Sequence, residues 1–262
     1  MTYQNANGQK WPYMLNDAHW LHVIDTDYDL VVMPWGATEP HNQHLPYGTD
    51  TIETMAIADR AAFLAQQQNA RVVILPPIPF GVNTGQLDLK LTINLNPSTQ
   101  LAILKDVLHS LSAQGFKKFC ILNGHGGNDF KQIIRELNGL FPDVFIFQIS
   151  WFKIAAKEGL FENPGDHADE METSLMMYIA ENLTLPLSEA GSGKNKHFRF
   201  PSLQEGWAWA PRRWTQISED TGSGDPSKAT PEKGQRYFKS VTEKIAGVFT
   251  DIAQTSLDTL YE

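Results

Sequence analysis

The sequence is poor in cysteine, in long apolar runs and in basic charge, and each shortage narrows the class of protein. Its single cysteine, Cys120, lies in an apolar run and cannot form an internal disulfide. This fits a reducing compartment, and the simplest interpretation of Cys120 is a small core residue. No stretch approaches the roughly 18 apolar residues of a membrane span. The N-terminus is polar rather than signal-like, so we expect a cytoplasmic protein with no membrane partner.

Positive charge is scarce because 21 Lys and Arg stand against 30 Asp and Glu, a formal net charge of −9. Such a surface repels phosphate backbones, so nucleic acid is not an expected partner. Hydrophobic residues make up 42% of the chain, which is ordinary for a globular protein. The length of 262 residues favours one large α/β domain, residues 1–262, over two small ones.

Short apolar runs alternate with helical patterns along the first part of the chain. Helical periodicity begins near Asp50, again at Asn96-Pro97, and once more after Asn128. The runs between are rich in Val, Ile and Phe, as buried parallel strands tend to be. They are Leu30 to Met33, Arg71 to Leu75, Phe119 to Leu122 and Val144 to Ile149. This alternation predicts a layered α/β sandwich, in which helices flank a mainly parallel sheet.

The last third of the chain is less regular. From Leu183 to Ala229 there is little periodicity, and three tryptophans (Trp207, Trp209, Trp214) stand among glycines, prolines and charges. So long an irregular stretch predicts a lid, a pocket wall or a subunit contact. A capping signature at Thr230-Pro231-Glu232 then predicts a closing helix.

The first polar cluster follows a predicted strand, at the edge where open α/β sheets bind ligands. Glu39 and His41 are two residues apart, so in an extended segment their side chains point the same way. Asp50 stands at the predicted start of the next helix. Carboxylates with imidazoles form a ligand set for zinc, manganese or iron, although each residue alone would also suit a solvated loop. His44 is a ligand, a pocket residue or a group that orients a neighbour.

The second cluster is the turn Asn123-Gly124-His125-Gly126-Gly127-Asn128, between the third predicted strand and a helix. Glycines around one histidine let the backbone approach a ligand closely, and the helix N-terminus favours an anion. A turn of this kind can also cradle phosphate. This one has neither a G-x-G-x-x-G pattern nor a P-loop lysine, so we discount nucleotide binding.

The third cluster places five ionisable side chains within the seven residues from Asp166 to Glu172. Such crowding is costly unless a cation or a substrate is nearby. A charged, solvated helix start would explain it equally well, because acidic residues favour the first turn of a helix. The residues alone leave both interpretations open.

Together the three clusters resemble the creatininase (creatinine amidohydrolase) family. Its marks are a Glu-x-His-x-x-His-Leu-Pro-x-x-x-Asp stretch, an Asn-Gly-His-Gly-Gly-Asn loop and a His-Ala-x-Glu-x-Glu-Thr-Ser segment. All three occur here in order, at Glu39, Asn123 and His167. The turn from Gly222 to Pro226 is a weaker mark. The resemblance covers most of the chain.

The resemblance implies a site for one or two divalent ions, with zinc as the first choice and manganese or iron as alternatives. It assigns Glu39, Asp50 and His125 to one metal and His41 to a second, with Asp50 as the bridge. His167 would transfer protons, paired with the Asp166 carboxylate. The family fold is a layered α/β domain assembled as a homo-oligomer, usually a hexamer.

The sequence also departs from the family pattern. Creatininases carry a glutamate two residues after the histidine of the second motif, where it completes the second metal site. That position is Gly127 here, and Glu172 is the candidate replacement. Pro40, Asn42 and Asp169 differ from the usual residues as well. We therefore expect metal binding but poor hydrolysis of creatinine.

The resulting prediction is a metal-dependent amidohydrolase that cleaves a C–N bond in a small amide, lactam or formamide. His44 and Trp151 are predicted to contact the substrate. The later tryptophans either cover the pocket or pack in the core or an interface. A formamide deformylase or a small-peptide hydrolase of the same family is the alternative. A metal-binding protein without catalysis, or a scaffold, is a third hypothesis, against which the presence of His167 argues.

Overall fold

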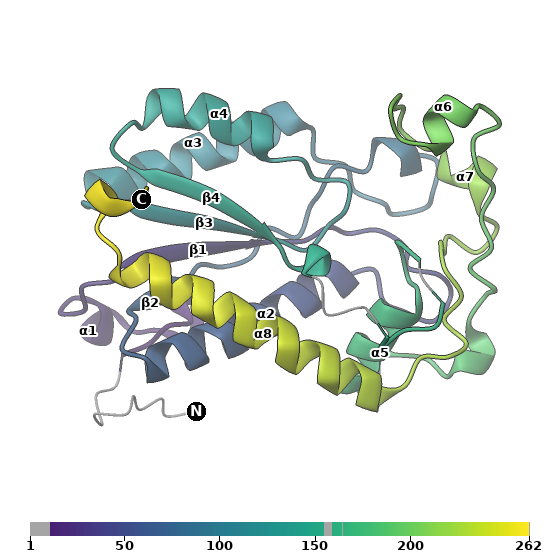
Figure 1. Ribbon diagram of the computed structural model, residues 1–262, viewed down its shortest axis with the longest axis horizontal. Helices are drawn as coiled ribbons and strands as arrows, with labels where there is room; N and C mark the ends of the chain where they lie inside the picture. The colour runs from purple at the N-terminus through teal and green to yellow at the C-terminus, as the bar shows by residue number, and fades with distance from the viewer. Residues whose placement is uncertain (1–10, 155–158, 164, 262) are drawn as a thin grey trace.

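Four parallel strands form the centre of the fold (Figure 1). The computed structural model describes residues 11–154, 159–163 and 165–261, so the polar N-terminal residues discussed above lie outside the described part. The strands follow the order β2-β1-β3-β4, and every adjacent pair is parallel. Their bounds are Leu30–Trp35 (β1), Val72–Ile74 (β2), Lys118–Asn123 (β3) and Phe145–Ser150 (β4). All four predicted strands and the predicted fold class are confirmed.

Helices cover both faces of this sheet (Figure 1). On one face lie α3 and α4, and on the other lie α2 and α8. The helix bounds are Trp20–Val23 (α1), Thr49–Gln67 (α2), Pro97–Ala113 (α3), Lys131–Leu140 (α4), Glu170–Ile179 (α5), Pro201–Gln204 (α6), Trp214–Ile217 (α7) and Pro231–Gln254 (α8). None of the helices in the described ranges is long and apolar enough to cross a membrane.

Alternate residues of the strands enter two separate cores. Leu30 and Val32 pack in the core that contains α2 and α8, whereas Val31 and Met33 pack with α3 and α4. This is the result of the two-residue period of a β-strand. Cys120 is fully buried in the first of these cores, as the sequence suggests.

The helix α8 packs against both α2 and α5. It begins where the sequence predicts, with the Thr230 hydroxyl accepting a hydrogen bond from the Lys233 N–H at 3.3 Å. The Thr230 N–H donates in turn to the Ser174 hydroxyl of α5 at 3.1 Å. The helices α2 and α5 are thus joined through α8, against which both of them pack.

The irregular segment 183–229 gathers at that end of the molecule, where it contains the short helices α6 and α7 (Figure 1). Two contacts fasten it to the loop that follows β2. Thr215 donates a hydrogen bond to the Asp88 carboxylate at 2.5 Å, and Gly85 lies directly against the Arg212 carbonyl. The segment therefore lies over the carboxyl edge of the sheet.

Candidate active site

Side chains from four separate segments converge at the carboxyl ends of β1 and β3. The five predicted metal ligands are all buried there, with at most 8% of each residue exposed. Three groups of three have ligand atoms within 4.8 Å of one another. Asp50 belongs to two of them, which are Glu39, Asp50 and His125, and His41, Asp50 and Glu172. The third group joins Glu39 and His41 to His167.

The two oxygens of Asp50 face different histidines. Its Oδ2 lies 2.9 Å from Nδ1 of His125, and its Oδ1 lies 3.0 Å from Nε2 of His41. Nδ1 of His125 is also 2.9 Å from Oε1 of Glu39. A carboxylate placed this way, between two sets of ligands, has the geometry of a bridging ligand.

Backbone carbonyls orient both imidazole rings. Nε2 of His125 donates to the Val82 carbonyl at 3.1 Å, and Nδ1 of His41 donates to the Glu39 carbonyl at 3.0 Å. A carbonyl can only accept, so these nitrogens carry the hydrogens. The other nitrogen of each ring faces the carboxylates, and it would offer a metal ion its lone pair once its proton is displaced.

Two asparagines hold the turn that carries His125. The Asn123 side chain accepts from the His125 N–H at 3.1 Å and donates to its carbonyl at 3.0 Å. The Asn128 carboxamide donates to Asn123 at 3.0 Å and accepts from the Val82 N–H at 3.0 Å. The polar ends of the motif thus tie the β3 turn to the loop after β2.

Two glycines of the same turn are packed so closely that a side chain would collide. A Cβ on Gly124 would overlap the Thr54 hydroxyl of α2, and one on Gly127 would overlap the Val82 carbonyl and the His125 ring. In this backbone, position 127 therefore has no room for the glutamate that creatininases carry. The carboxylate that joins His41 and Asp50 is that of Glu172, from the first turn of α5.

The buried charges of the cluster shift one another's pKa values. Burial alone would lower the pKa of His41, but the Asp50 carboxylate raises it to about 9. Burial raises the pKa of Glu172 to about 8, aided by Asp169 and Asp50 and opposed by His41. At neutral pH these two groups retain protons that a bound cation would displace. The residues present therefore fit a divalent metal ion, by donor type and by charge.

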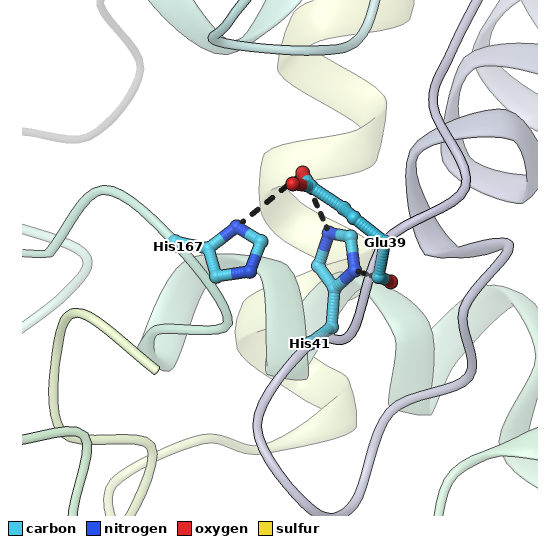
Figure 2. Close-up of side chains that lie close together, drawn as sticks. All are labelled: Glu39, His41 and His167. Atoms are coloured by element: carbon cyan, nitrogen blue, oxygen red, sulfur yellow. Dashed lines mark hydrogen bonds and ion pairs between the residues drawn. The ribbon is translucent and has the colours of Figure 1, made fainter. Parts of the chain in front are cut away.

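His167 lies beside the ligands (Figure 2). Its Nδ1 is 3.7 Å from Oε1 of Glu39, and its Nε2 donates to the Pro40 carbonyl at 2.8 Å. Its ring centroid is 4.2 Å from that of His41. Burial lowers the pKa of His167, and the neighbouring His41 lowers it further, so the ring is neutral at pH 7. Its backbone is held by reciprocal hydrogen bonds with Ser223.

Asp166 occupies a different position from the one predicted. Its carboxylate accepts from Nη1 of Arg212 at 2.8 Å and is about half exposed, whereas neither ring nitrogen of His167 bonds to it. The Arg212 guanidinium draws the Asp166 carboxylate to the outer side of the loop, whereas the His167 ring is held at the Pro40 carbonyl. The predicted pairing of Asp166 with His167 is therefore corrected.

The two residues predicted to contact substrate lie away from the site cavity. Trp151 is fully buried in the core, where its Nε1 donates to the Thr54 hydroxyl at 3.0 Å. Its neighbour Phe152 lines the cavity instead. His44 is buried too, with Nε2 2.9 Å from the Thr173 hydroxyl of α5. The sequence left three roles open for His44: metal ligand, pocket residue, or a group that orients a neighbour. The contact with Thr173 agrees with the third role.

A cavity of about 440 Å³ opens above the cluster. Glu39, Asp50, His125, His167 and Glu172 line it. Trp214, which is buried, and Trp209, which is 84% exposed, form part of its wall, whereas Trp207 lies outside it. The pocket-wall interpretation of the segment thus holds for two of its three tryptophans.

Gln86 and Arg212 are two of the cavity residues that the sequence motifs do not indicate. Gln86 donates a hydrogen bond to Oε2 of Glu39, and Arg212 lies in the wall. Gln86 had a usable signal, because its loop contains Gly81 and Gly85 and follows β2 at the same sheet edge. Arg212 had none, since it stands in a segment without periodicity.

Comparisons with known proteins agree with this geometry. The family model described as "Creatininase: Creatinine amidohydrolase" matches residues 16–249. A mycofactocin precursor peptide peptidase from Mycobacterium ulcerans (strain Agy99) is 27% identical over 227 residues, 84% of each chain.

Two solved structures share the fold. A candidate creatinine amidohydrolase from Bacteroides fragilis NCTC 9343 is 46% identical, with a TM-score of 0.89 over 95% of this chain and 98% of that one. A mutant creatininase of Zn-Zn type is 18% identical, with a TM-score of 0.76 over 93% of this chain and 99% of that one. On the extent of the family match, the chain belongs to the creatininase family of hydrolases.

Proposed function

We propose that the protein is a metal-dependent hydrolase that cleaves the C–N bond of an amide in a small molecule or short peptide. The observation that carries the proposal is the buried, doubly shared Asp50 carboxylate between two sets of carboxylate and imidazole donors. Glu39, Asp50 and His125 would hold one divalent ion, and His41, Asp50 and Glu172 a second. A divalent ion there would polarise an amide carbonyl and lower the pKa of a water molecule.

His167 is the proton-transferring residue of this proposal. It is neutral at pH 7, and its donor nitrogen is occupied by the Pro40 carbonyl. The free Nδ1 faces the cluster beside Glu39, so it can accept a proton from water and then give it to the leaving nitrogen. Trp214 packs against the His167 ring, at 4.7 Å between centroids, and restricts solvent on that side.

Two observations favour a peptide-like amide over creatinine itself. The cavity of about 440 Å³ lies in the range that accommodates drug-sized ligands, which is more room than one small ring needs. The relative that matches 84% of the chain carries the name of a peptidase. We therefore place amides of short peptides first, and lactams and formamides second.

Metal analysis and a substrate panel together test the proposal. Protein incubated with zinc or manganese and then desalted should retain at least one equivalent. It should hydrolyse a member of a panel of short peptides, formamides, lactams and creatinine. Asp50→Asn should lose both metal and activity, whereas Asp106→Asn, on the exposed face of α3, should keep both. Well under one equivalent of metal in the wild type would refute the proposal.

A further inference from the structure

A second cavity lies beside the first and shares a wall with it. Its volume is about 450 Å³, and Asp166, Trp209 and Arg212 line both cavities. The second cavity extends away from the candidate metal ligands, along residues 195–198 of the irregular segment. The irregular segment therefore lines two adjoining hollows that are open to solvent.

The second cavity concentrates positive charge in an acidic protein. The whole chain carries a formal charge of −9. The charged side chains around this cavity are Lys196, Arg212 and Asp166, with His197 as a further basic group. Within residues 11–154, 159–163 and 165–261, no carboxylate pairs with Lys196. The side chains around this cavity therefore carry a net charge of about +1, whereas the whole chain carries −9.

Arg212 is held in the shared wall by contacts on two sides. Its Nη1 is 2.8 Å from the Asp166 carboxylate, and its guanidinium lies 4.8 Å from the ring centroid of Trp214. A guanidinium has five N–H donors, and this ion pair is the one polar contact of the Arg212 side chain to the described residues. The remaining donors can therefore bind an anion without the Asp166 pair being broken.

We propose that this second cavity is a subsite for a carboxylate of the substrate, while the amide to be cleaved occupies the first. The inference rests on the proposed function and names its substrate class. That class is an amide with a free carboxylate on one side, such as a short peptide or an acylated amino acid. Arg212 supplies the planar fork that matches a carboxylate, and Lys196 supplies a second charge.

The test compares binding of an acid and its neutral counterpart. The probes are N-acetylglycylglycine and its C-terminal amide, titrated by ligand-observed NMR into zinc-loaded, full-length protein. The acid should bind at least about 10-fold more tightly than the amide, which corresponds to about 1.4 kcal/mol. Arg212→Gln and Lys196→Met should each remove most of this preference. Arg213→Gln and Lys194→Met should retain it, because neither residue lines either of these two cavities.

Three results would overturn the subsite. They are equal binding of acid and amide, an equal loss of preference in the control variants, and a full preference in the cavity variants. The last would mean that the carboxylate binds at the metal ligands instead. The readout is binding of the intact probe, so it tests the subsite even in a protein that shows no turnover. A protein that prefers the acid through Arg212 and Lys196 but hydrolyses nothing would refute the proposed function alone.

Discussion

A single methyl group at Gly124 should disturb both the stability and the metal affinity of the protein. Gly124 lies where the β3 turn crosses α2, and a Cβ there would be driven into the Thr54 hydroxyl. It would also stand 2.9 Å from the Asp50 carbonyl and 2.9 Å from Nε1 of Trp151. In Gly124→Ala the hydrogen bond between Thr54 and Trp151 must therefore open, and the first turn of α2 must move.

The magnitude follows from these two effects. Loss of one buried hydrogen bond costs about 1 kcal/mol, and overpacking of a close contact costs about 1–3 kcal/mol. We expect the free energy of unfolding to fall by about 2–4 kcal/mol, which lowers Tm by about 4–8 °C in a chain of this size. Displacement of Asp50 from His125 should weaken metal binding by about 10–100-fold, as loss of an orienting contact commonly does.

Gly126→Ala is the matched control, two residues along the same turn. A Cβ at Gly126 meets nothing within 4 Å, and the glycine has no positive φ. This variant should be unchanged or slightly stabilised, because alanine reduces the entropy of the unfolded chain. Denaturant unfolding at fixed metal concentration, with a zinc titration of each variant, measures both quantities. If Gly124→Ala matches Gly126→Ala in both, the packing argument is refuted.

Three further predictions concern the site itself. His167→Ala should lower kcat by about 10²–10⁴-fold with metal content unchanged; loss of the metal instead would make His167 a ligand. Glu172→Ala should bind one metal equivalent fewer by titration calorimetry, and unchanged two-site binding would contradict its role. Because a metal ligand must be deprotonated and Asp50 raises the pKa of His41 to about 9, metal affinity should rise from about pH 6 toward about pH 9. A metal affinity that stays constant or falls as the pH rises over that range would contradict the prediction.

The sheet and the ligand cluster could be predicted because each depends on local pattern. Buried strands such as Val72–Ile74 show as runs of β-branched residues, and strand ends in a parallel sheet meet at one edge. Glu39, His41 and Asp50 follow one strand and His125 another, so their convergence needs no knowledge of packing.

The direction of individual side chains could not be predicted in the same way. Trp151 follows directly after β4, yet its ring turns into the core, because Thr54 of α2 offers its indole N–H a partner. Asp166 and His167 are neighbours, but Arg212, 46 positions after Asp166, determines where the carboxylate goes. Side-chain contacts between residues so far apart in the sequence produce no local pattern from which they could be predicted.

The tight packing around Gly127 has a consequence for the residues that this position can hold. The Val82 carbonyl and the His125 ring fill the space that a side chain at this position would need. Glu172 already joins His41 and Asp50, so a glutamate at 127 would add crowding without supplying a missing ligand. The loop after β2 would have to move before such a glutamate could be accepted. In this chain the backbone of that loop, rather than the choice of ligand, therefore decides which residues position 127 can hold.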